Sequence, residues 1–450
     1  MLALGVIADD FTGATDVAGM LVRGGLRTVQ LIGVPSSSGA DDIDTEAAVA
    51  GAEAVVVALK SRTTPAADAV AESLAAWHWL RAAGAKRCYF KYCSTFDSTP
   101  AGNIGPVTEA LMSELGTDFT IACPAFPENG RTIFRGHLFV GDVLLSDSGM
   151  RDHPLTPMRD ANLVRVLQAQ CGAGTRVGLI RYDTVARGTE AVRQRIAALR
   201  SEGVRMAVAD ALHDDDLRTL AAGCSDLPLL TAGSGLALGL PELYERLGEA
   251  RRHADAAGLD PMVGPAVVLS GSCSQATNAQ VAHWRDAGRP ARALDVRALL
   301  RGDGAAAAEV AAVLAWARPL IGRGDGDDAV PLIYSTAAPS ELAATQSELG
   351  ALEAGARVEH ALAAIARELG SMGVRRWVVA GGETSGAVVQ ALGASALRIG
   401  PTICPGVPWT QAQRRAAPGA QGAQGGSIWL ALKSGNFGAP DFFSAALRMK

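Results

Sequence analysis

The segment Ile7–Asp16, IADDFTGATD, places two adjacent carboxylates directly after a short apolar run. A strand that ends in Asp9 and Asp10 and continues through a Thr-Gly turn into a helix brings both acids to the carboxyl edge of a parallel sheet, where open α/β folds bind ligands. A carboxylate there can accept hydrogen bonds from polyol hydroxyls or take the proton of an attacking hydroxyl. The pattern leaves open which acid is the base, and a simple helix-capping role for Asp10 also fits it.

A second polar segment, FKYCSTFDSTPAGNIGP at 90–106, also follows an apolar run. It joins the cationic Lys91 to a dense set of hydroxyl groups, which suits an anionic, hydroxyl-rich ligand, although a plain polar loop is the alternative. Upstream, Lys60 and Arg62 follow an apolar run in the same way and add donors for a carboxylate. We therefore predict a catalytic role for Lys91 beside Asp9 and Asp10. The predicted substrate-binding residues are Lys60, Arg62, Ser94, Thr95 and Asp97.

Lysine is rare in this chain, because only five of its 41 basic side chains are lysines. Arginine serves wherever a surface cation suffices, so a retained lysine indicates a place that needs a compact ammonium rather than a planar fork. Lys60, Lys91 and Lys433 lie in motif-like surroundings. The alternative is that each of these three lysines has been retained by chance.

Three Gly/Ser-rich turns lie in the C-terminal part of the chain, within LSGSCSQATN (269–278), VAGGETSG (379–386) and LKSGNFG (432–438). The first two run from a predicted strand into a helix start, so their free backbone N–H groups and the helix dipole can face phosphates. None is a GxxxxGK[ST] loop, and no GxGxxG follows a strand. One such turn is weak evidence, but three together indicate a nucleotide.

The order of the elements predicts an α/β protein. Short apolar runs, polar turns and amphipathic stretches alternate along the 450 residues, as in βα units around a mostly parallel sheet. The Gly/Pro-punctuated segment 248–264 is the best boundary, which gives an N-terminal domain at 1–255 and a C-terminal domain at 256–450. We predict two α/β domains, each a mostly parallel sheet flanked by helices, with the active site in the cleft between them. The stretch 414–426 is predicted to be a surface loop.

Composition excludes several classes of protein. The net charge is −5 and the pI is about 5.9, which argues against nucleic acid as a partner. Seven scattered cysteines without metal-ligand spacing indicate neither a disulfide framework nor a zinc site, and they favour a reducing cytoplasm. No membrane span is expected, because the Ala-rich run 305–317 is interrupted by Glu309. The oligomeric state stays open, and a homo-oligomer is compatible with the sequence.

Eight segments, in this order along nearly the whole chain, resemble the four-carbon acid sugar kinases: IADDFTGATD, KSRT, FKYCSTFDSTPAGNIGP, CPAFPENGRT, GSCS, GGETSG, PGVPW and LKSGNFG. The FKYCSTFDST form is similar to the branch that phosphorylates 3-oxo-tetronate, whereas threonate and erythronate kinases carry a DSTLRGN-like version. One departure is the long Ala/Gly/Gln-rich stretch between Trp409 and Leu430, which leaves the register before LKSGNFG open.

The resemblance implies an N-terminal acid-sugar-binding domain and a C-terminal ATP-binding domain. It implies ATP- and Mg²⁺-dependent phosphorylation of the C4 hydroxyl of a four-carbon acid sugar, with 3-oxo-tetronate as the first candidate. It also implies nucleotide contacts at Ser270, Gly271, Ser272, Gly381, Gly382, Glu383, Thr384 and Gly435. The metal ligands stay unknown. A threonate or erythronate 4-kinase is the alternative within the class, and a non-catalytic sensor that binds nucleotide and sugar acid is the alternative outside it.

Overall fold

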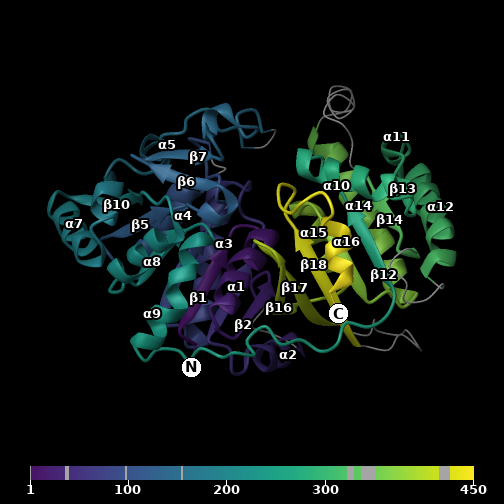
Figure 1. Ribbon diagram of the computed structural model, residues 1–450, viewed down its shortest axis with the longest axis horizontal. Coiled ribbons are helices and arrows are strands. Elements are labelled where there is room, and N and C mark those ends of the chain that lie inside the picture. The colour runs from purple at the N-terminus through teal and green to yellow at the C-terminus, as the bar shows by residue number, and fades with distance from the viewer. Residues whose placement is uncertain are drawn as a thin grey trace. The chain divides into compact units, whose positions relative to one another are not determined.

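The computed structural model describes residues 2–35, 40–96, 99–153, 156–321, 329–335, 351–414 and 426–449. The chain divides into two compact units, Met1–Ala257 and Gly258–Lys450, which run from purple to teal and from green to yellow in Figure 1. Each unit contains a mostly parallel sheet with flanking helices. The predicted fold class is therefore confirmed, while the predicted cleft site stays a prediction.

The first unit contains a parallel sheet in the order β2-β3-β1-β4-β11-β5-β10-β9. Its central strands β1 and β3 have the sequences LGVIA and AVVVA and are buried throughout, as expected for parallel strands covered on both faces. The strands are β1 (Leu4–Ala8), β2 (Thr28–Ile32), β3 (Ala54–Ala58), β4 (Arg87–Lys91), β5 (Thr120–Cys123), β9 (Arg176–Ile180), β10 (Val204–Ala209) and β11 (Leu229–Ala232).

Helices connect these strands, and several pack on the sheet, as α1 does against β1 and β3 and α7 does against β9 and β10. The helices of the first unit are α1 (Phe11–Arg23), α2 (Ala40–Val49), α3 (Ala66–Ala82), α4 (Ile104–Glu114), α5 (Leu163–Gln170), α6 (Tyr182–Val185), α7 (Thr189–Ser201), α8 (Asp214–Gly223) and α9 (Leu240–Arg246). A short 3₁₀ helix, η3 (Gly235–Gly239), follows β11.

The segment 123–154, which its Pro and Gly content suggests is a long loop, instead contains a small antiparallel sheet. It comprises β6 (Arg131–Phe134), β7 (His137–Val140) and β8 (Val143–Leu144), with the 3₁₀ turns η1 (Pro127–Asn129) and η2 (Leu145–Asp147). Arg135 and Gly136 form the hairpin turn with φ angles of 51° and 74°. The Asp210 carboxylate accepts hydrogen bonds from both of their backbone N–H groups, at 2.7 and 2.8 Å. The sequence around the hairpin does not indicate this contact, because Asp210 lies more than seventy residues further along the chain.

The second unit contains a mixed sheet in the order β13-β14-β12-β15-β18-β17-β16, parallel from β13 to β18 and antiparallel from β18 to β16. The strands are β12 (Ala266–Ser270), β13 (Ala291–Ala293), β14 (Leu332–Tyr334), β15 (Arg376–Ala380), β16 (Ala396–Cys404), β17 (Val407–Arg414) and β18 (Gly426–Lys433). The predicted surface loop between β17 and β18 lies, at 415–425, outside the described residues.

One face of this sheet forms an aromatic core with two helices. Trp284 of α10 and Phe443 of α16 lie edge to face with ring centroids 6.2 Å apart, and the Trp409 indole of β17 donates to the Ala446 carbonyl. The helices of the second unit are α10 (Gln275–Asp286), α11 (Val296–Leu300), α12 (Asp303–Ile321), α14 (Ala351–Ser371), α15 (Gly382–Ala391) and α16 (Phe442–Arg448).

Among the described helices, α12 is long and apolar enough to cross a membrane by length and composition alone. One such helix is weak evidence for a span. This helix also carries Glu309 and an internal Pro319. The expectation of no membrane partner stays a prediction.

Candidate active site

The carboxyl ends of β1 and β4 lie side by side, because Ala8 pairs with Lys91 in parallel register. From β1 the chain passes through α1 to β2 on one side of the sheet, and from β4 it passes through α4 to β5 on the other. The strand order therefore reverses between β1 and β4, and open parallel sheets bind ligands at such a switch point. The segments that begin at Asp9 and Lys91 thus meet where a ligand is expected.

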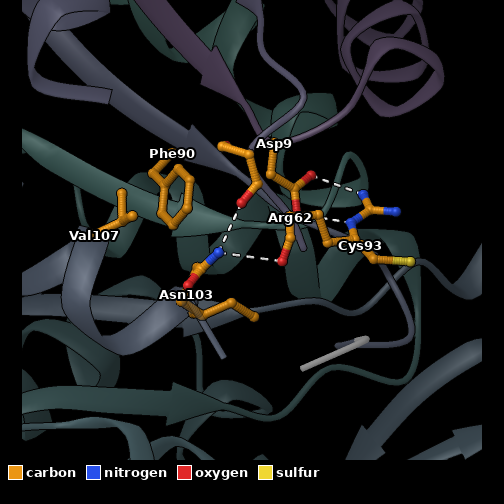
Figure 2. Close-up of a pocket in the computed structure, with 8 residues that line it drawn as sticks. Asp9, Arg62, Phe90, Cys93, Asn103 and Val107 are labelled. Atoms are coloured by element: carbon orange, nitrogen blue, oxygen red, sulfur yellow. Dashed lines mark hydrogen bonds and ion pairs between the residues drawn. The ribbon is translucent and has the colours of Figure 1, made fainter. Parts of the chain in front are cut away.

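Arg62 fixes the two adjacent carboxylates. Its Nε donates to Asp9 Oδ2 at 2.9 Å, and its Nη2 lies 2.7 Å from both Asp9 Oδ1 and Asp10 Oδ1. Figure 2 shows the bidentate contact with Asp9, which is 6% exposed. Charge-assisted bidentate pairs of this kind are among the stronger polar contacts in proteins. The substrate-binding role that the sequence predicted for Arg62 stays a prediction, and in the structure Arg62 orients both candidate bases.

Asn103 holds the turn that carries Arg62. Its side-chain amide nitrogen lies 2.7 Å from the Ser61 carbonyl oxygen, 3.2 Å from that of Arg62 and 3.0 Å from that of Thr64. Asn103, Ser61 and Arg62 line a pocket together with Asp9, and Figure 2 labels three of these four residues, Asn103, Arg62 and Asp9. Asn103 was not among the predicted site residues, although its place in the polar run 90–106 was a signal for it.

Asp10 is the N-cap of α1, so the capping role is confirmed. A catalytic role of the same residue stays a prediction. Its side chain accepts hydrogen bonds from the Gly13 N–H at 3.1 Å and from the Thr12 hydroxyl at 2.8 Å. Burial alone would raise the pKa of the Asp10 carboxyl, but Arg62 and Lys91 together hold that pKa below its usual value. Asp10 is therefore an anion at neutral pH. In contrast, burial raises the pKa of Asp9 against the opposing effect of Arg62.

The Lys91 ammonium lies next to the first turn of α1. A Cβ at Gly13 would be 2.2 Å from Asp10 Oδ1 and 2.8 Å from Lys91 Nζ, so any side chain there would displace one or both of these groups. Lys91 is 2% exposed and donates to the Tyr92 carbonyl oxygen at 2.8 Å. Within the described part of the chain it has no other hydrogen bond or ion pair. A buried ammonium with unused N–H groups at a switch point is suited to an anionic ligand.

Asp16, on the inner side of α1, is a buried carboxyl that the sequence prediction missed. Its Oδ2 accepts a hydrogen bond of 2.6 Å from the hydroxyl of Ser234, which precedes η3. Its Oδ1 is buried and has no partner among the described residues. Burial raises the pKa of this carboxyl to about 6, against the opposing charge of Lys91.

We expect Asp16→Asn to gain stability relative to the wild type as the pH rises. The folded-state pKa of about 6 lies above the ordinary aspartate pKa of 3.8, so the folded wild type binds the proton more tightly than the unfolded chain does. The stability that this gives the wild type is lost as the pH rises through 6. The free energy of unfolding of the variant, relative to wild type, should increase by about 1 kcal/mol from pH 5 to 7.5. Urea denaturation at both pH values measures it. Asp68→Asn, at an exposed position of α3, is the control, and a pH-independent difference would contradict the prediction.

The other predicted substrate-binding residues follow the neighbouring strands. Ser94 and Thr95 come after β4 and are 8% and 4% exposed, and the Thr95 hydroxyl lies 2.9 Å from the Cys93 Sγ. Lys60 is exposed just beyond β3. Asp97 lies outside the described residues. The substrate-binding roles of all four stay predictions.

The second unit repeats the switch-point arrangement. In parallel register, Ser270 of β12 pairs with Ala380 of β15, and Ala380 pairs with Lys433 of β18. The chain leaves β12 toward β13 on one side and leaves β15 toward β16 on the other, so the strand order reverses between β12 and β15. The three Gly/Ser-rich turns therefore begin at three neighbouring strand ends. They contain the predicted nucleotide-binding residues Ser270, Gly271, Ser272, Gly381, Gly382, Glu383, Thr384 and Gly435.

Two helix N-termini meet at these turns. Ser274 caps α10 by accepting from the Thr277 N–H, and Gly381, with a φ of 125°, is the N-cap of α15. A Cβ at Gly271 would lie 2.1 Å from the Thr384 hydroxyl, so the two turns touch. Helix N-termini with free N–H groups attract phosphates. The nucleotide contacts remain predictions, and their proximity supports them.

Comparisons with known proteins match both units. Residues 4–240 match a family described as a sugar-binding N-terminal domain, and residues 267–443 match one described as a nucleotide-binding C-terminal domain. The chain therefore belongs to the four-carbon acid sugar kinase family, as its sequence motifs suggested.

Close relatives match this chain over nearly its full length. The 3-oxo-tetronate kinase of Cupriavidus necator is 59% identical and that of Pseudomonas fluorescens is 60% identical, each over 99% of this chain and 96% of the relative. A solved structure from Salmonella typhimurium LT2, described as a putative tRNA synthase, is 45% identical with a TM-score of 0.81, covering 100% of this chain and 99% of that one.

Proposed function

We propose that this chain transfers the γ-phosphoryl group of ATP to the C4 hydroxyl of 3-oxo-tetronate, giving ADP and 3-oxo-tetronate 4-phosphate. The relatives with the name 3-oxo-tetronate kinase support this substrate, since they share about 60% identity with nearly the whole chain. The observation that carries the proposal is the switch point of the first unit. There, a buried ammonium with unused donors lies beside a carboxylate pair that Arg62 holds in place.

In this mechanism the protein mainly positions the reactants and supplies charge, because phosphoryl transfer passes through a loose transition state. The bond from the C4 oxygen to the γ-phosphorus forms as the bond from that phosphorus to the β–γ bridging oxygen breaks. Asp10, held by Arg62, receives the hydroxyl proton. Lys91 donates hydrogen bonds to the substrate carboxylate or to the transferring phosphoryl group.

The N-termini of α10 and α15 bind the nucleotide phosphates in this proposal. Mg²⁺ would neutralise those phosphates when bound. The described residues contain no group of three His, Cys, Asp or Glu side chains placed to hold a metal ion. This fits Mg²⁺, which binds mostly through phosphates and water with one or two carboxylates. Glu383, exposed in the first turn of α15, is the carboxylate that would contribute.

The test is an ADP-release assay on the full-length chain with Mg²⁺ and a panel of acceptors. We expect 3-oxo-tetronate to have a kcat/KM at least about tenfold above threonate and erythronate, because a site that binds the 3-oxo group loses a polar contact with them. Glucose and glycerol, which lack the carboxylate, should be inert, and EDTA should abolish turnover.

The same assay separates the alternatives. Preference for threonate or erythronate would place the enzyme in the other branch of the family. Equal activity on a neutral sugar would contradict carboxylate recognition. A sensor would bind nucleotide and sugar acid but release no ADP.

A further inference from the structure

Lys433 is the last residue of β18, and its ammonium lies inside the second unit. The side chain is fully buried. Its Nζ donates to the Thr277 hydroxyl at 3.0 Å and to the carbonyl oxygens of Ser434 and Gly435, both at 2.9 Å. All three N–H groups are therefore used by the protein, and within the described part of the chain no carboxylate pairs with the charge. This differs from Lys91, whose ammonium makes one hydrogen bond to the residues that the structure describes.

These contacts join the 434–438 turn to the start of α10. The Gly435 carbonyl oxygen also accepts from the hydroxyls of Ser274, at 2.5 Å, and Thr277, at 2.9 Å. A Cβ at Gly435 would lie 2.5 Å from the Ser272 hydroxyl, so the turn packs directly on the 271–274 turn. The ammonium of Lys433 and the N-cap of α10 thus share one carbonyl acceptor.

The backbone of the same residue contacts the second helix start. The Lys433 carbonyl oxygen accepts a hydrogen bond of 2.8 Å from the N–H of Gly381, the N-cap of α15. A Cβ at Gly381 would lie 3.2 Å from the backbone nitrogen of Ser272. One residue is therefore bonded to both helix N-termini, through its side chain to one and through its backbone to the other.

We infer that Lys433 is a positioning residue, which aligns the N-termini of α10 and α15 for the nucleotide phosphates and places a positive charge behind them without touching the nucleotide. The inference rests on the proposed function for the presence of a nucleotide. It assigns different tasks to two buried lysines. Lys91 has N–H groups that the described residues do not use and that can bind a ligand. Lys433 instead uses its N–H groups to hold Thr277 and Gly435 in place.

The surroundings of the ammonium give this role a measurable signature. Burial lowers the pKa of Lys433 to about 7. Cys404 of β16 is the titratable group whose charge acts on it, and the Phe442 ring of α16 lies 6.0 Å away. An anionic nucleotide would raise this pKa. Binding above pH 7 should therefore be accompanied by proton uptake at Lys433.

The experiment is calorimetric titration of the full-length chain with MgADP at pH 8, in two buffers of different ionisation enthalpy. The wild type should take up as much as about one proton per bound nucleotide. Lys433→Met keeps the length of the side chain but removes its charge and donors. It should weaken MgADP binding on the order of 10- to 100-fold and remove the proton uptake. The kcat at saturating ATP should fall less than the affinity.

A second variant covers the case in which Lys433→Met does not fold. Thr277→Val removes one acceptor of the ammonium and should weaken MgADP binding by about threefold or more, while Thr277→Ser keeps the hydroxyl and should bind like the wild type. Unchanged affinity in Lys433→Met or Thr277→Val overturns the inference. So does a large fall in kcat at unchanged affinity, because Lys433 would then act on the transferring group.

The same titration separates this inference from the proposed function. A wild-type chain that binds MgADP with proton uptake but phosphorylates no four-carbon acid sugar would overturn the function and leave the role of Lys433 standing. A wild-type chain that binds no MgADP would overturn both.

Discussion

Lys91→Arg should lower kcat/KM by about 10²-fold or more although it keeps the positive charge. The ammonium is 2% exposed and fits beside Gly13, where even a methyl group would be 2.8 Å from it. A guanidinium is wider and planar, so it would displace the ligand or disturb the first turn of α1. Lys91→Met should be at least as inactive, because it removes both the positive charge and the N–H donors of the ammonium.

Steady-state kinetics on folded variants, with near-UV circular dichroism as the check of folding, measures this effect. The control is Lys86→Arg, which changes an exposed lysine immediately before β4 and should keep wild-type kinetics. If Lys91→Arg also keeps wild-type kcat/KM, the lysine is a chance survivor of the arginine-rich composition. The argument from lysine scarcity would then fail for Lys60 and Lys433 as well.

The alternation of apolar runs with Gly, Ser and Thr turns was enough to predict some strands of each sheet, whereas β2 and β16 were not predicted. The apolar run before Asp9 is β1, and those before Lys60 and Ser272 contain β3 and β12. The strand order was not predictable, because it depends on which strands pair across long sequence separations. Local patterns therefore indicated candidate residues at strand ends, and it is strand pairing, such as that of Ala8 with Lys91 and of Ser270 with Ala380, that brings those ends together.

The sequence indicated which residues belong to the site better than it indicated the contacts among them. Arg62 could be recognised as a cation near a predicted site, but its bonds to Asp9 and Asp10 span more than fifty positions in the sequence. Asp16 was missed because its importance comes from burial beside Ser234, 218 residues away. Lys433 at the end of β18 was recognised from lysine scarcity, yet its hydrogen bond to Thr277 of α10 spans 156 positions. Local patterns identify residue types, whereas burial and distant partners decide their roles.

Asp10→Asn should lower kcat by about 10²-fold or more while nucleotide affinity stays near wild type. The fold should tolerate this change, because asparagine is as good an N-cap as aspartate and can still accept from the Gly13 N–H. The variant loses the negative charge that receives the hydroxyl proton. The assignment to Asp10 rather than Asp9 follows from access, since the Asp10 side chain is 20% exposed and that of Asp9 is 8%.

Asp9→Asn is the matched comparison, because both oxygens of Asp9 are bonded to Arg62. Removing one partner of a buried bidentate pair should lower the free energy of unfolding by about 3 kcal/mol, so this variant should lose stability more than intrinsic activity. Kinetics and urea denaturation of both variants, with MgADP titration for affinity, separate the two roles. A normal kcat in Asp10→Asn together with a reduced kcat in folded Asp9→Asn would transfer the base to Asp9. Normal kcat in both would leave Asp97 as the remaining predicted carboxylate of the substrate site.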